Sequence, residues 1–224
     1  MDAMTYSYAI EQFLGAVAPF KGLPRAARQE LAGVSVERHF QKGETVFREG
    51  QPSQSIWVLK SGRVHLVHHL VSGRLSTTCM IVPNELFCCL PALDQQAYPA
   101  TAIAAEASVV VQIPTARVHA LMAQQPAFTE RVLCTVCERI RQIEFTGCRA
   151  QDPVEQRVAQ ALLTLQKKFG TTLPLTRQEL ADLVGTTVET TIRTLSHFQR
   201  KGWLRSGRGK IELLKPAALQ QFLQ

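Results

Sequence analysis

The residues of this chain with the most distinctive chemistry are its six cysteines, two of which are adjacent: Cys88 and Cys89 in the stretch ELFCCLPALDQQAYPATA. Cys134 and Cys137 are three residues apart, and Cys148 follows eleven residues later. Thiolates bind soft ions such as zinc, copper(I) or a trivalent metalloid, and a pair of thiols can form a disulfide on oxidation. Each cysteine taken singly also fits a buried structural role, because free cysteine is among the most buried residue types.

The composition restricts the class of protein. The chain has 224 residues, of which 46% are hydrophobic, and no apolar run long enough to cross a bilayer. Its first residues carry acids and no basic segment ahead of an apolar run, so they do not form a secretory signal. We therefore expect a cytoplasmic protein with no membrane partner, in a compartment where thiols stay reduced and a disulfide scaffold is not formed.

Positive charge is concentrated in the last third of the chain. From Asp152 onward there are 11 Lys and Arg against 6 Asp and Glu, whereas the first 151 residues carry 14 and 12. A basic surplus in one part of a chain indicates a polyanionic partner for that part.

Two periodicities divide the chain. Residues 39–111 contain short alternating apolar runs punctuated by glycine, a pattern typical of a many-stranded antiparallel sandwich or barrel. Helices are expected before it, at 9–17 and 25–31. From Pro114 the pattern is helical, and Pro126 is expected in the first turn of a longer helix, where its missing N–H does no harm.

The apolar residues of this long helix recur at spacings of three and four, as in a coiled-coil seam. The stripe consists of Thr129, Val132, Val136, Ile140 and Ile143. We expect its last four members to form the interface of a homodimer; the alternative is that the stripe packs on its own domain. Cys134, Cys137 and Cys148 share a separate stripe of the same helix.

The last part of the chain has the signals of a second domain. A helix is expected at 154–169. Two capping boxes follow, each a threonine with a glutamate three residues later: Thr176 with Glu179, and Thr186 with Glu189. With a glycine between them, they predict a helix-turn-helix. The stretch WLRSGRGKIELL then predicts two short strands around a turn, which form a wing.

The second helix of this pair has a face suited to reading base pairs. Four polar residues recur at spacings of four, three and four, opposite an apolar side: Glu189, Arg193, Ser196 and Arg200. Arg193 can donate two hydrogen bonds to guanine and Glu189 can accept one from cytosine, although the two could also form an ion pair within the helix. Val188 and Ile192 border this face and would either contact thymine methyl groups or pack under the neighbouring helix.

Further polar residues lie at a helix N-terminus or in the wing turn, positions from which phosphates are held without reading sequence. They are Thr176, Arg177, Gln178, Arg208 and Lys210.

In the order of its parts the chain resembles the Crp/Fnr family of bacterial transcription regulators. The resemblance is carried by the β-roll segment FQKGETVFREGQPSQSIWVLKSGRV, by the single long helix and by the stretch GTTVETTIRTLSHFQRKGWL, which is especially similar to the Fnr branch. It implies an α+β fold in three parts: a cyclic-nucleotide-binding-like β-roll with flanking helices (1–114), a dimerisation helix region (115–149) and a winged helix-turn-helix DNA-binding domain (150–224).

The resemblance also implies partners. It predicts a homodimer on a palindromic double-stranded DNA site, with half-sites about one helical turn apart, RNA polymerase as a further partner, and no enzymatic activity. By position, Glu189 and Arg193 match the base-reading residues of the family, whereas Ile192 stands where the Fnr branch commonly has Ser.

The sensor segment departs from the pattern of the family. Cyclic-nucleotide binders carry Gly-Glu and then Arg-Ser or Arg-Thr to hold the ribose and phosphate, whereas here Cys88-Cys89 and Tyr98-Pro99 take those places. A cyclic phosphate needs the charge of the arginine and backbone N–H donors, and Pro99 has none to give. Cyclic AMP is therefore not the expected signal. The iron–sulfur sensor of Fnr is not expected either, because the first cysteine is Cys79.

These departures leave the effector open. In the family the segment that holds the cyclic nucleotide, here called the cassette, lies beside the long helix. Cys88 or Cys89 of this segment could therefore approach Cys134 or Cys137, with Cys148 further along. Such a group could bind a soft metal or metalloid ion, or form a redox pair that shifts the helix.

Other readings of the same residues remain. One is a haem-based gas sensor at the strand that carries His65, His68 and His69, although strand alternation puts His68 opposite the other two. Another is a regulator with structural cysteines and a different small-molecule effector. A dithiol enzyme is disfavoured, because the Cys134-x-x-Cys137 pair lies in the middle of a helix.

Overall fold

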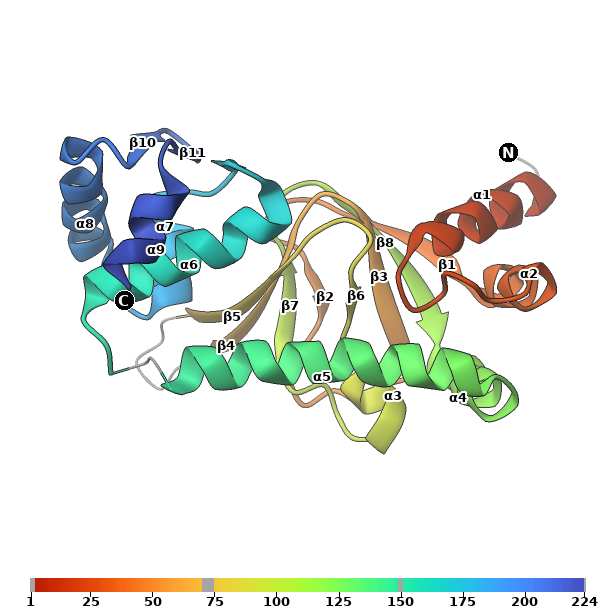
Figure 1. Cartoon of the computed structure of the whole chain (residues 1–224). Helices are drawn as coiled ribbons and strands as arrows, with labels where there is room; N and C mark the ends of the chain where they lie inside the picture. Colours follow the sequence, from red (N-terminus) through yellow and green to blue (C-terminus); the bar gives the residue numbers. More distant parts are fainter. Residues whose placement is uncertain (1–2, 70–74, 149–150, 224) are drawn as a thin grey trace. The chain divides into compact units, whose positions relative to one another are not determined.

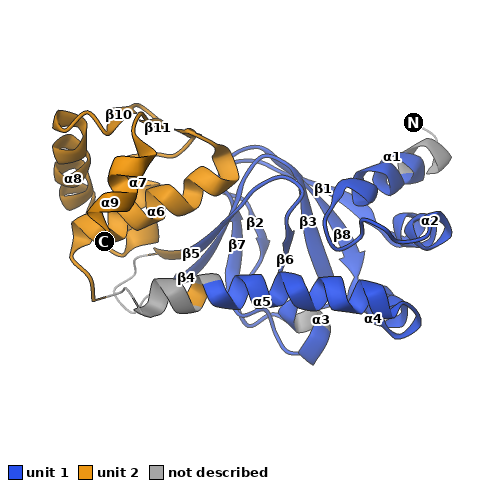
Figure 2. Cartoon of the chain, viewed as in Figure 1, with its two compact units in different colours: residues 1–68, 78–142 blue, residues 69–77, 143–224 orange. Residues whose placement is uncertain are grey.

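The computed structural model describes residues 3–69, 75–148 and 151–223 (Figure 1). The chain forms two compact units, coloured separately in Figure 2: unit 1 comprises residues 1–68 and 78–142, and unit 2 comprises residues 69–77 and 143–224. Among the helices of the described residues, none has the length and apolar character needed to cross a membrane.

Unit 1 is built on two four-stranded sheets, in the orders β1-β8-β3-β6 and β2-β7-β4-β5. The strands are β1 (Val36–Phe40), β2 (Thr45–Phe47), β3 (Ser55–Ser61), β4 (Val64–His69), β5 (Leu75–Ile81), β6 (Leu86–Phe87), β7 (Thr101–Ala104) and β8 (Ser108–Pro114). Each pairing with a described register is antiparallel. The expected many-stranded antiparallel β-roll is thus confirmed.

Five helices accompany these sheets in the described chain: α1 (Ala3–Ala16), α2 (Arg25–Val34), α3 (Leu90–Asp94), α4 (Thr115–Gln124) and α5 (Pro126–Cys148). Pro126 is the first residue of α5, as its missing N–H predicts.

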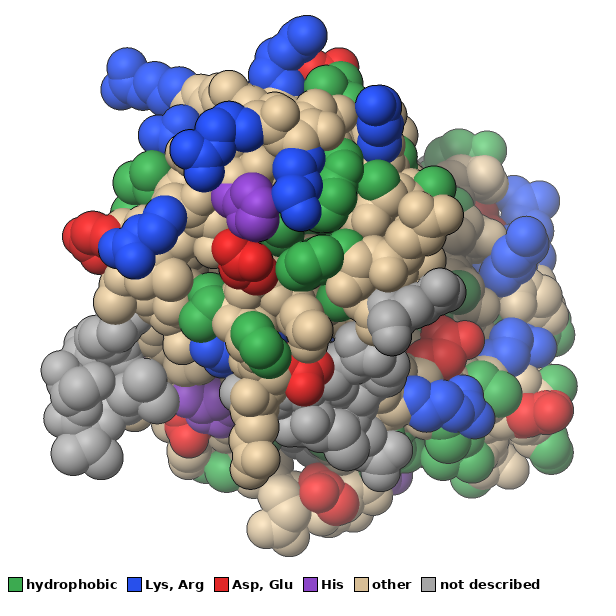
Figure 3. Space-filling view, turned by 60° about the vertical axis from the view of Figure 1, so that its left-hand side comes forward, with side chains coloured by type: hydrophobic (Ala, Val, Ile, Leu, Met, Phe, Trp, Pro, Cys, Tyr) green, Lys and Arg blue, Asp and Glu red, His purple; other side chains and the backbone are tan. Residues whose placement is uncertain are grey.

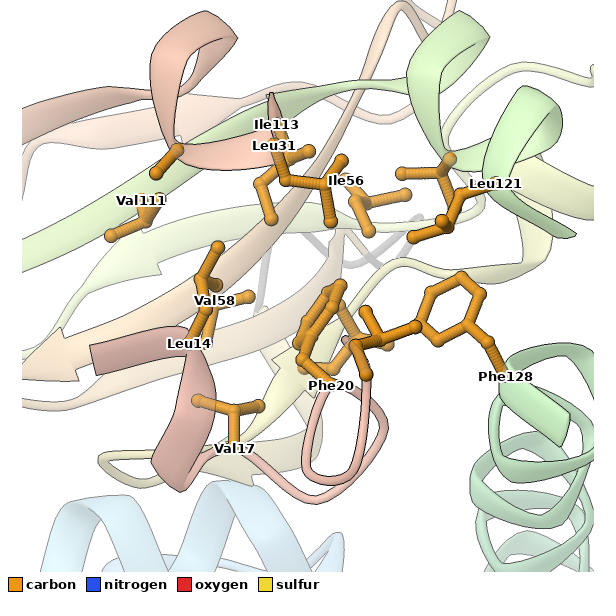
Figure 4. Close-up of a cluster of buried hydrophobic side chains, with 14 of the residues drawn as sticks. Leu14, Val17, Phe20, Leu31, Ile56, Val58, Val111, Ile113, Leu121 and Phe128 are labelled. Atoms are coloured by element: carbon orange, nitrogen blue, oxygen red, sulfur yellow. The ribbon is translucent and has the colours of Figure 1, made fainter. Parts of the chain in front are cut away.

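Strand alternation gives unit 1 two hydrophobic clusters. Ile56 and Val58 of β3 point into the first, which we call the helix-side core; it contains residues of α1, α2, α4 and α5 and is drawn in Figure 4. Trp57 and Leu59 point to the opposite face, into the inter-sheet core, which contains residues of both sheets. β3, β6 and β8 each contribute side chains to both clusters, so the two cores lie on opposite faces of the same sheet.

The N-terminal half of α5 packs on its own unit. Phe128 and Val132 belong to the helix-side core, and the ring of Phe128 lies 5.5 Å from that of Phe20. Of the four predicted interface residues, Val132 and Val136 are only 2% and 7% exposed, whereas Ile140 and Ile143 are 43% and 58% exposed. The predicted dimer seam does not fit at Val132 and Val136, because these side chains are buried within their own chain.

Unit 2 contains the helices α6 (Val154–Phe169), α7 (Arg177–Val184), α8 (Val188–Arg200) and α9 (Pro216–Phe222). A three-stranded sheet accompanies them in the order β10-β11-β9, formed by β9 (Thr172–Leu173), β10 (Leu204–Gly207) and β11 (Lys210–Leu213). The bounds of α6 agree with those expected from the sequence, and Gly170 follows it with a positive φ of 75°. The predicted helix-turn-helix and wing are both present.

Candidate nucleic-acid interface and sensor interior

The helix-turn-helix is held by its caps. The Thr176 hydroxyl accepts a hydrogen bond from the Glu179 N–H at 3.1 Å, and the Glu179 carboxylate accepts one from the Thr176 N–H at 2.6 Å, which confirms the first capping box. α7 then ends at Gly185, whose φ of 68° and ψ of 45° place it in the left-handed region.

The second predicted capping box is wrong by one residue. α8 is capped by Thr187, whose hydroxyl accepts from the Thr190 N–H at 3.2 Å. The reason lies in the turn: the Thr186 N–H donates to the Ala181 carbonyl at 3.0 Å and so completes the end of α7. Since Thr186 closes one helix, the next residue begins the other.

α8 separates a buried side from an exposed one. Its buried side chains are Thr191, Thr194, Leu195 and Phe198, so the side opposite the predicted polar face packs on the domain. On the outer side Glu189, Arg193, Ser196 and Arg200 are all exposed. Ile192 is also exposed, at 39%, whereas Val188 is half-buried. The outer face therefore presents an acid and a guanidinium one helical turn apart, with an apolar side chain between them.

The predicted phosphate-holding residues are exposed as well. Thr176, Arg177 and Gln178 lie at the start of α7, where backbone N–H groups and the helix dipole favour an anion. Arg208 and Lys210 lie at the tip of the β10–β11 hairpin, where Gly209 has a φ of 70°. Figure 3 shows Lys and Arg side chains spread over the face of unit 2 that is turned to the viewer.

Contacts distant in sequence hold α8 in place. His197 Nδ1 lies 3.0 Å from the Glu155 carboxylate of α6, and the side-chain carbonyl of Gln199 accepts from the Ser206 N–H of β10 at 3.0 Å. The Arg157 guanidinium donates to the Val184 carbonyl at the end of α7 at 2.8 Å. Sequence reasoning missed these positioning residues, because each contact joins segments that no local pattern connects.

The inter-sheet core is filled by aromatic side chains. Tyr98 is buried, and its ring stacks on Phe47 at 4.0 Å between centroids. Its hydroxyl accepts a hydrogen bond from Trp57 Nε1 at 3.0 Å and donates one to the Ser55 carbonyl at 2.8 Å. The residue that stands in place of an arginine of cyclic-nucleotide binders is therefore a fully hydrogen-bonded part of the core.

Three cysteines of unit 1 lie near one arginine of α5. The Arg139 guanidinium contacts Cys79 Sγ, and its charge also acts on Cys88 and Cys89. Burial raises the pKa of both the Cys88 and the Cys89 thiol; for Cys88 the neighbouring Cys89 raises it further, and Arg139 opposes the shift.

The cysteines of α5 do not complete a thiolate cluster. Cys134 and Cys137 are exposed, and the residue of α5 beside the cassette thiols is Arg139 instead. Within 3–69, 75–148 and 151–223, no group of three or more His, Cys, Asp or Glu is placed to hold a metal ion. The side chain of Cys148 lies outside the described residues.

The histidines of β4 do not converge either. His68 Nδ1 lies 3.1 Å from the Glu49 carboxylate, His65 is half-buried and His69 is exposed. The expected alternation on this strand places His68 on the face opposite His65 and His69.

Both units match known domains. Residues 156–222 match the family model of the Crp-like helix-turn-helix domain, and residues 37–125 match that of the cyclic nucleotide-binding domain. A cyclic nucleotide-binding domain joined to a helix-turn-helix domain defines the class of the protein, which is a DNA-binding transcription regulator with a sensor domain.

The relatives are consistent with this class. The chain is 27% identical over 208 residues to the CRP-like cAMP-activated global transcriptional regulator of Mycobacterium tuberculosis. This alignment covers 88% of this chain and 92% of the relative. It is 29% identical over 182 residues to the transcriptional activator protein anr of Pseudomonas aeruginosa, covering 77% and 74%. The structure of FixK2 from Bradyrhizobium japonicum shares the fold with a TM-score of 0.78, at 21% identity, over 84% of this chain and 96% of that one. The chain belongs to the Crp/Fnr family of transcription regulators.

Proposed function

We propose that this regulator acts as a homodimer that reads a palindromic DNA site through Glu189 and Arg193, and that its β-roll senses a signal other than cyclic AMP through cysteine thiols. The observation that carries the DNA-reading part is the outer face of α8, where both side chains are exposed four residues apart on a helix that is bonded to α6 and to β10. RNA polymerase is the further partner that we propose for the DNA-bound form.

The division of labour at the DNA follows from chemistry. Arg193 donates a bidentate pair of hydrogen bonds to guanine and Glu189 accepts from cytosine, so that one G·C pair of each half-site is read directly. Ile192 contacts the major groove through apolar surface. The start of α7 and the wing hold phosphates through Thr176, Arg177, Gln178, Arg208 and Lys210, and thereby set the register of α8 without reading bases.

Replacement of Arg193 tests the reading model. Arg193→Ala is expected to cost about 1–3 kcal/mol of discrimination between the specific site and one with the G·C pair exchanged. Arg193→Lys keeps the charge and is expected to lose most of the same discrimination, because the planar fork is absent. Arg177→Ala is the control: it should weaken binding uniformly across sequences and lower the salt dependence by about one ion. Unchanged discrimination in both Arg193 variants would contradict the model.

The exposed stripe of α5 supports the homodimer. Leu133, Cys137 and Ile140 are spaced by four and three residues and are all exposed, with Leu133 and Ile140 at 47% and 43%. Apolar residues at this spacing form the seam of a two-stranded coiled coil. We therefore propose a seam through this stripe, continued toward Ile143.

Charge in the seam tests the dimer. The double substitution Leu133→Glu with Ile140→Glu is expected to give monomers in sedimentation and to abolish binding to the palindrome, because two copies then place acids against each other. Glu138→Gln, also exposed on α5, is the control and should stay dimeric. A dimeric double variant would refute this seam.

The interior of the β-roll supports a signal other than cyclic AMP. A cyclic phosphate requires cationic and N–H donors, but the corresponding segment contributes Tyr98, which is buried in the aromatic cluster, and Pro99, which has no N–H. Thermal unfolding with and without cyclic AMP tests this point: a ligand at 100 times its Kd would add about 2.7 kcal/mol of stability, and we expect no change.

The grouping of Cys79, Cys88 and Cys89 beside Arg139 supports sensing through thiols. Anaerobic purification followed by metal analysis, a visible spectrum and thiol counting separates the possible effectors. We expect thiols that react with oxidants or soft metals, and no Soret band. A strong Soret band would instead establish a haem sensor, and thiols that do not respond to oxidants or soft metals would refute thiol sensing.

A further inference from the structure

The three cysteines near Arg139 come from different parts of unit 1. Cys79 lies in β5, Cys88 and Cys89 follow β6, and Arg139 lies on α5. Cys79 Sγ accepts from the Arg139 guanidinium and is within 3.7 Å of the Met80 carbonyl, to which it donates. This contact places a positively charged side chain of α5 directly against the Cys79 sulfur.

Cys88 is held in an unusual backbone conformation. Its φ is 53°, in the left-handed region that a residue with a Cβ rarely adopts, and only two other described non-glycine residues, Asn84 and Gln95, have a positive φ. Such positions persist when the surrounding structure enforces them and are concentrated at functional sites. The conformation also turns the two adjacent cysteines to different environments.

The two hydrophobic clusters distinguish the cysteines. Cys79 and Cys88 both pack against the inter-sheet core, whereas Cys89 packs against the helix-side core. Cys79, from β5, and Cys88, from the segment after β6, therefore pack against the same group of side chains, whereas Cys89 packs against the other. This arrangement selects one pair among the three possible pairs.

We propose that Cys79 and Cys88 are a redox pair that a peroxide converts to a disulfide, and that Arg139 transmits the change to α5. The inference deepens the proposed function, on whose thiol sensing it rests, by naming the pair, the class of oxidant and the residue that couples them to the helix. It replaces Cys134 and Cys137 as partners of the cassette thiols.

The chemistry balances in two steps. The Cys79 sulfur attacks one peroxide oxygen, the O–O bond breaks, and Cys79 becomes a sulfenic acid; the departing hydroxide takes up the proton that Cys79 lost and leaves as water. The Cys88 sulfur then attacks the sulfenic sulfur, the S–O bond breaks, and the hydroxyl leaves as a second water with the Cys88 proton. The two thiols lose two electrons, and the two peroxide oxygens gain them.

The environment of Cys88 sets the pace of the second step. Burial raises the pKa of the Cys88 thiol, and only the thiolate attacks sulfur, so the Cys88 proton has to pass to the departing hydroxyl as the S–S bond forms. We therefore expect this step to be slower than the first. A low-molecular-weight dithiol reverses the reaction by thiol–disulfide exchange.

Arg139 links the pair to the helix. In the reduced state its guanidinium is bonded to Cys79 Sγ, and Ile140 of the proposed seam is the next residue along α5. A disulfide removes the thiol that Arg139 engages, so the restraint on this part of α5 is lost. We expect the oxidised protein to bind DNA at least about fivefold more weakly, at the lower end of ordinary allosteric coupling.

Peptide mapping tests whether Cys79 is bonded to the Cys88-Cys89 segment, and the variants described next distinguish Cys88 from Cys89. Between Leu75 and Arg117 there is no Lys or Arg, but cleavage after Glu85 and Glu106 separates Cys79 from Cys88 and Cys89. After mild peroxide treatment of the full-length protein, digestion with trypsin and a glutamate-specific protease should give fragments 75–85 and 86–106 joined by a disulfide. A bond between Cys88 and Cys89 would instead leave fragment 86–106 alone, lighter by two hydrogens, and would refute the assignment.

Variants connect the pair to DNA affinity. Cys79→Ser and Cys88→Gly should each abolish the peroxide effect on binding to the palindrome; glycine suits the positive φ at residue 88, so this variant is expected to fold. Cys88→Ala is the second variant at this site and should act in the same way. Cys89→Ser and Cys134→Ser are the controls and should respond like the parent protein; Cys134 is exposed on α5 and lies outside the proposed seam.

The possible results test the Cys79–Cys88 pair separately from the proposed function on which it rests. If peroxide weakens DNA binding and the response requires Cys134 or Cys137 instead, thiol sensing holds and this pair is refuted. If the disulfide between Cys79 and Cys88 forms while DNA affinity is unchanged, the coupling through Arg139 is refuted. If reduced protein fails to bind the palindrome, the DNA-reading proposal itself fails, whatever the thiols do.

Discussion

The interior of the β-roll and the outer face of α8 differ in how far their side chains are exposed to solvent. In the β-roll, Phe47, Trp57 and Tyr98 pack together, and the Tyr98 hydroxyl is bonded on both sides. On α8, charged side chains stay at the surface while Leu195 and Phe198 anchor the helix from beneath. The side chains of the first region are buried against one another, whereas the charged side chains of the second are exposed to solvent. Under the proposed function, the DNA-reading surface could therefore stay the same while the interior of the β-roll changes.

The largest effect should follow from opening the inter-sheet core. Phe47 is buried and its ring lies within 6.1 Å of those of Trp57, Phe87 and Tyr98. Phe47→Ala is expected to lower the free energy of unfolding by about 3–5 kcal/mol, since it removes buried contacts and leaves a cavity. Denaturant unfolding measures this loss; a cost below about 1 kcal/mol would mean that the roll interior tolerates empty space and could admit a ligand.

A smaller effect isolates the hydrogen bonds from the packing. Tyr98→Phe keeps the ring on Phe47 but removes the hydroxyl that joins Trp57 to Ser55. The buried Trp57 N–H then lacks this acceptor, which is expected to cost about 1–3 kcal/mol in the free energy of unfolding. A neutral result would show that the polar pair is dispensable and that stacking alone fills the roll.

The smallest effect concerns the start of α8. Thr187→Ala removes the hydroxyl that caps the helix and is expected to cost about 1 kcal/mol in the free energy of unfolding. Thr186→Ala, at the position that the sequence favours as the cap, should cost less, since it keeps the backbone N–H that bonds to the Ala181 carbonyl. Equal costs would mean that both threonines take part in the turn.

Several helix boundaries in both units could be predicted because they depend on local chemistry. Pro126, Gly170, Gly185 and the Thr176 capping box each fix the backbone through interactions within a few residues. Where two threonines stand side by side after Gly185, the local signal does not distinguish them. Only the hydrogen bond from Thr186 to Ala181 decides which one caps α8.

The long-range contacts could not be predicted in the same way. α5 has apolar residues on more than one stripe, so its periodicity does not reveal that Val132 faces inward while Leu133 stays exposed. The contact of Arg139 with Cys79 joins residues 60 positions apart, and that of Tyr98 with Trp57 spans 41 positions. Such pairs depend on how strands and helices meet in three dimensions, which spacing along one segment does not encode.

The chain contains two tryptophans, and the fold puts one in each unit. The Trp57 indole is buried with its N–H bonded to a phenol, whereas that of Trp203 is half-buried, with the Lys201 ammonium 4.6 Å from its ring centre. Their fluorescence should therefore differ in emission maximum and in accessibility to quenchers. Two variants with a single tryptophan each would let an optical signal be assigned to the sensor or to the DNA-reading unit, without any attached dye.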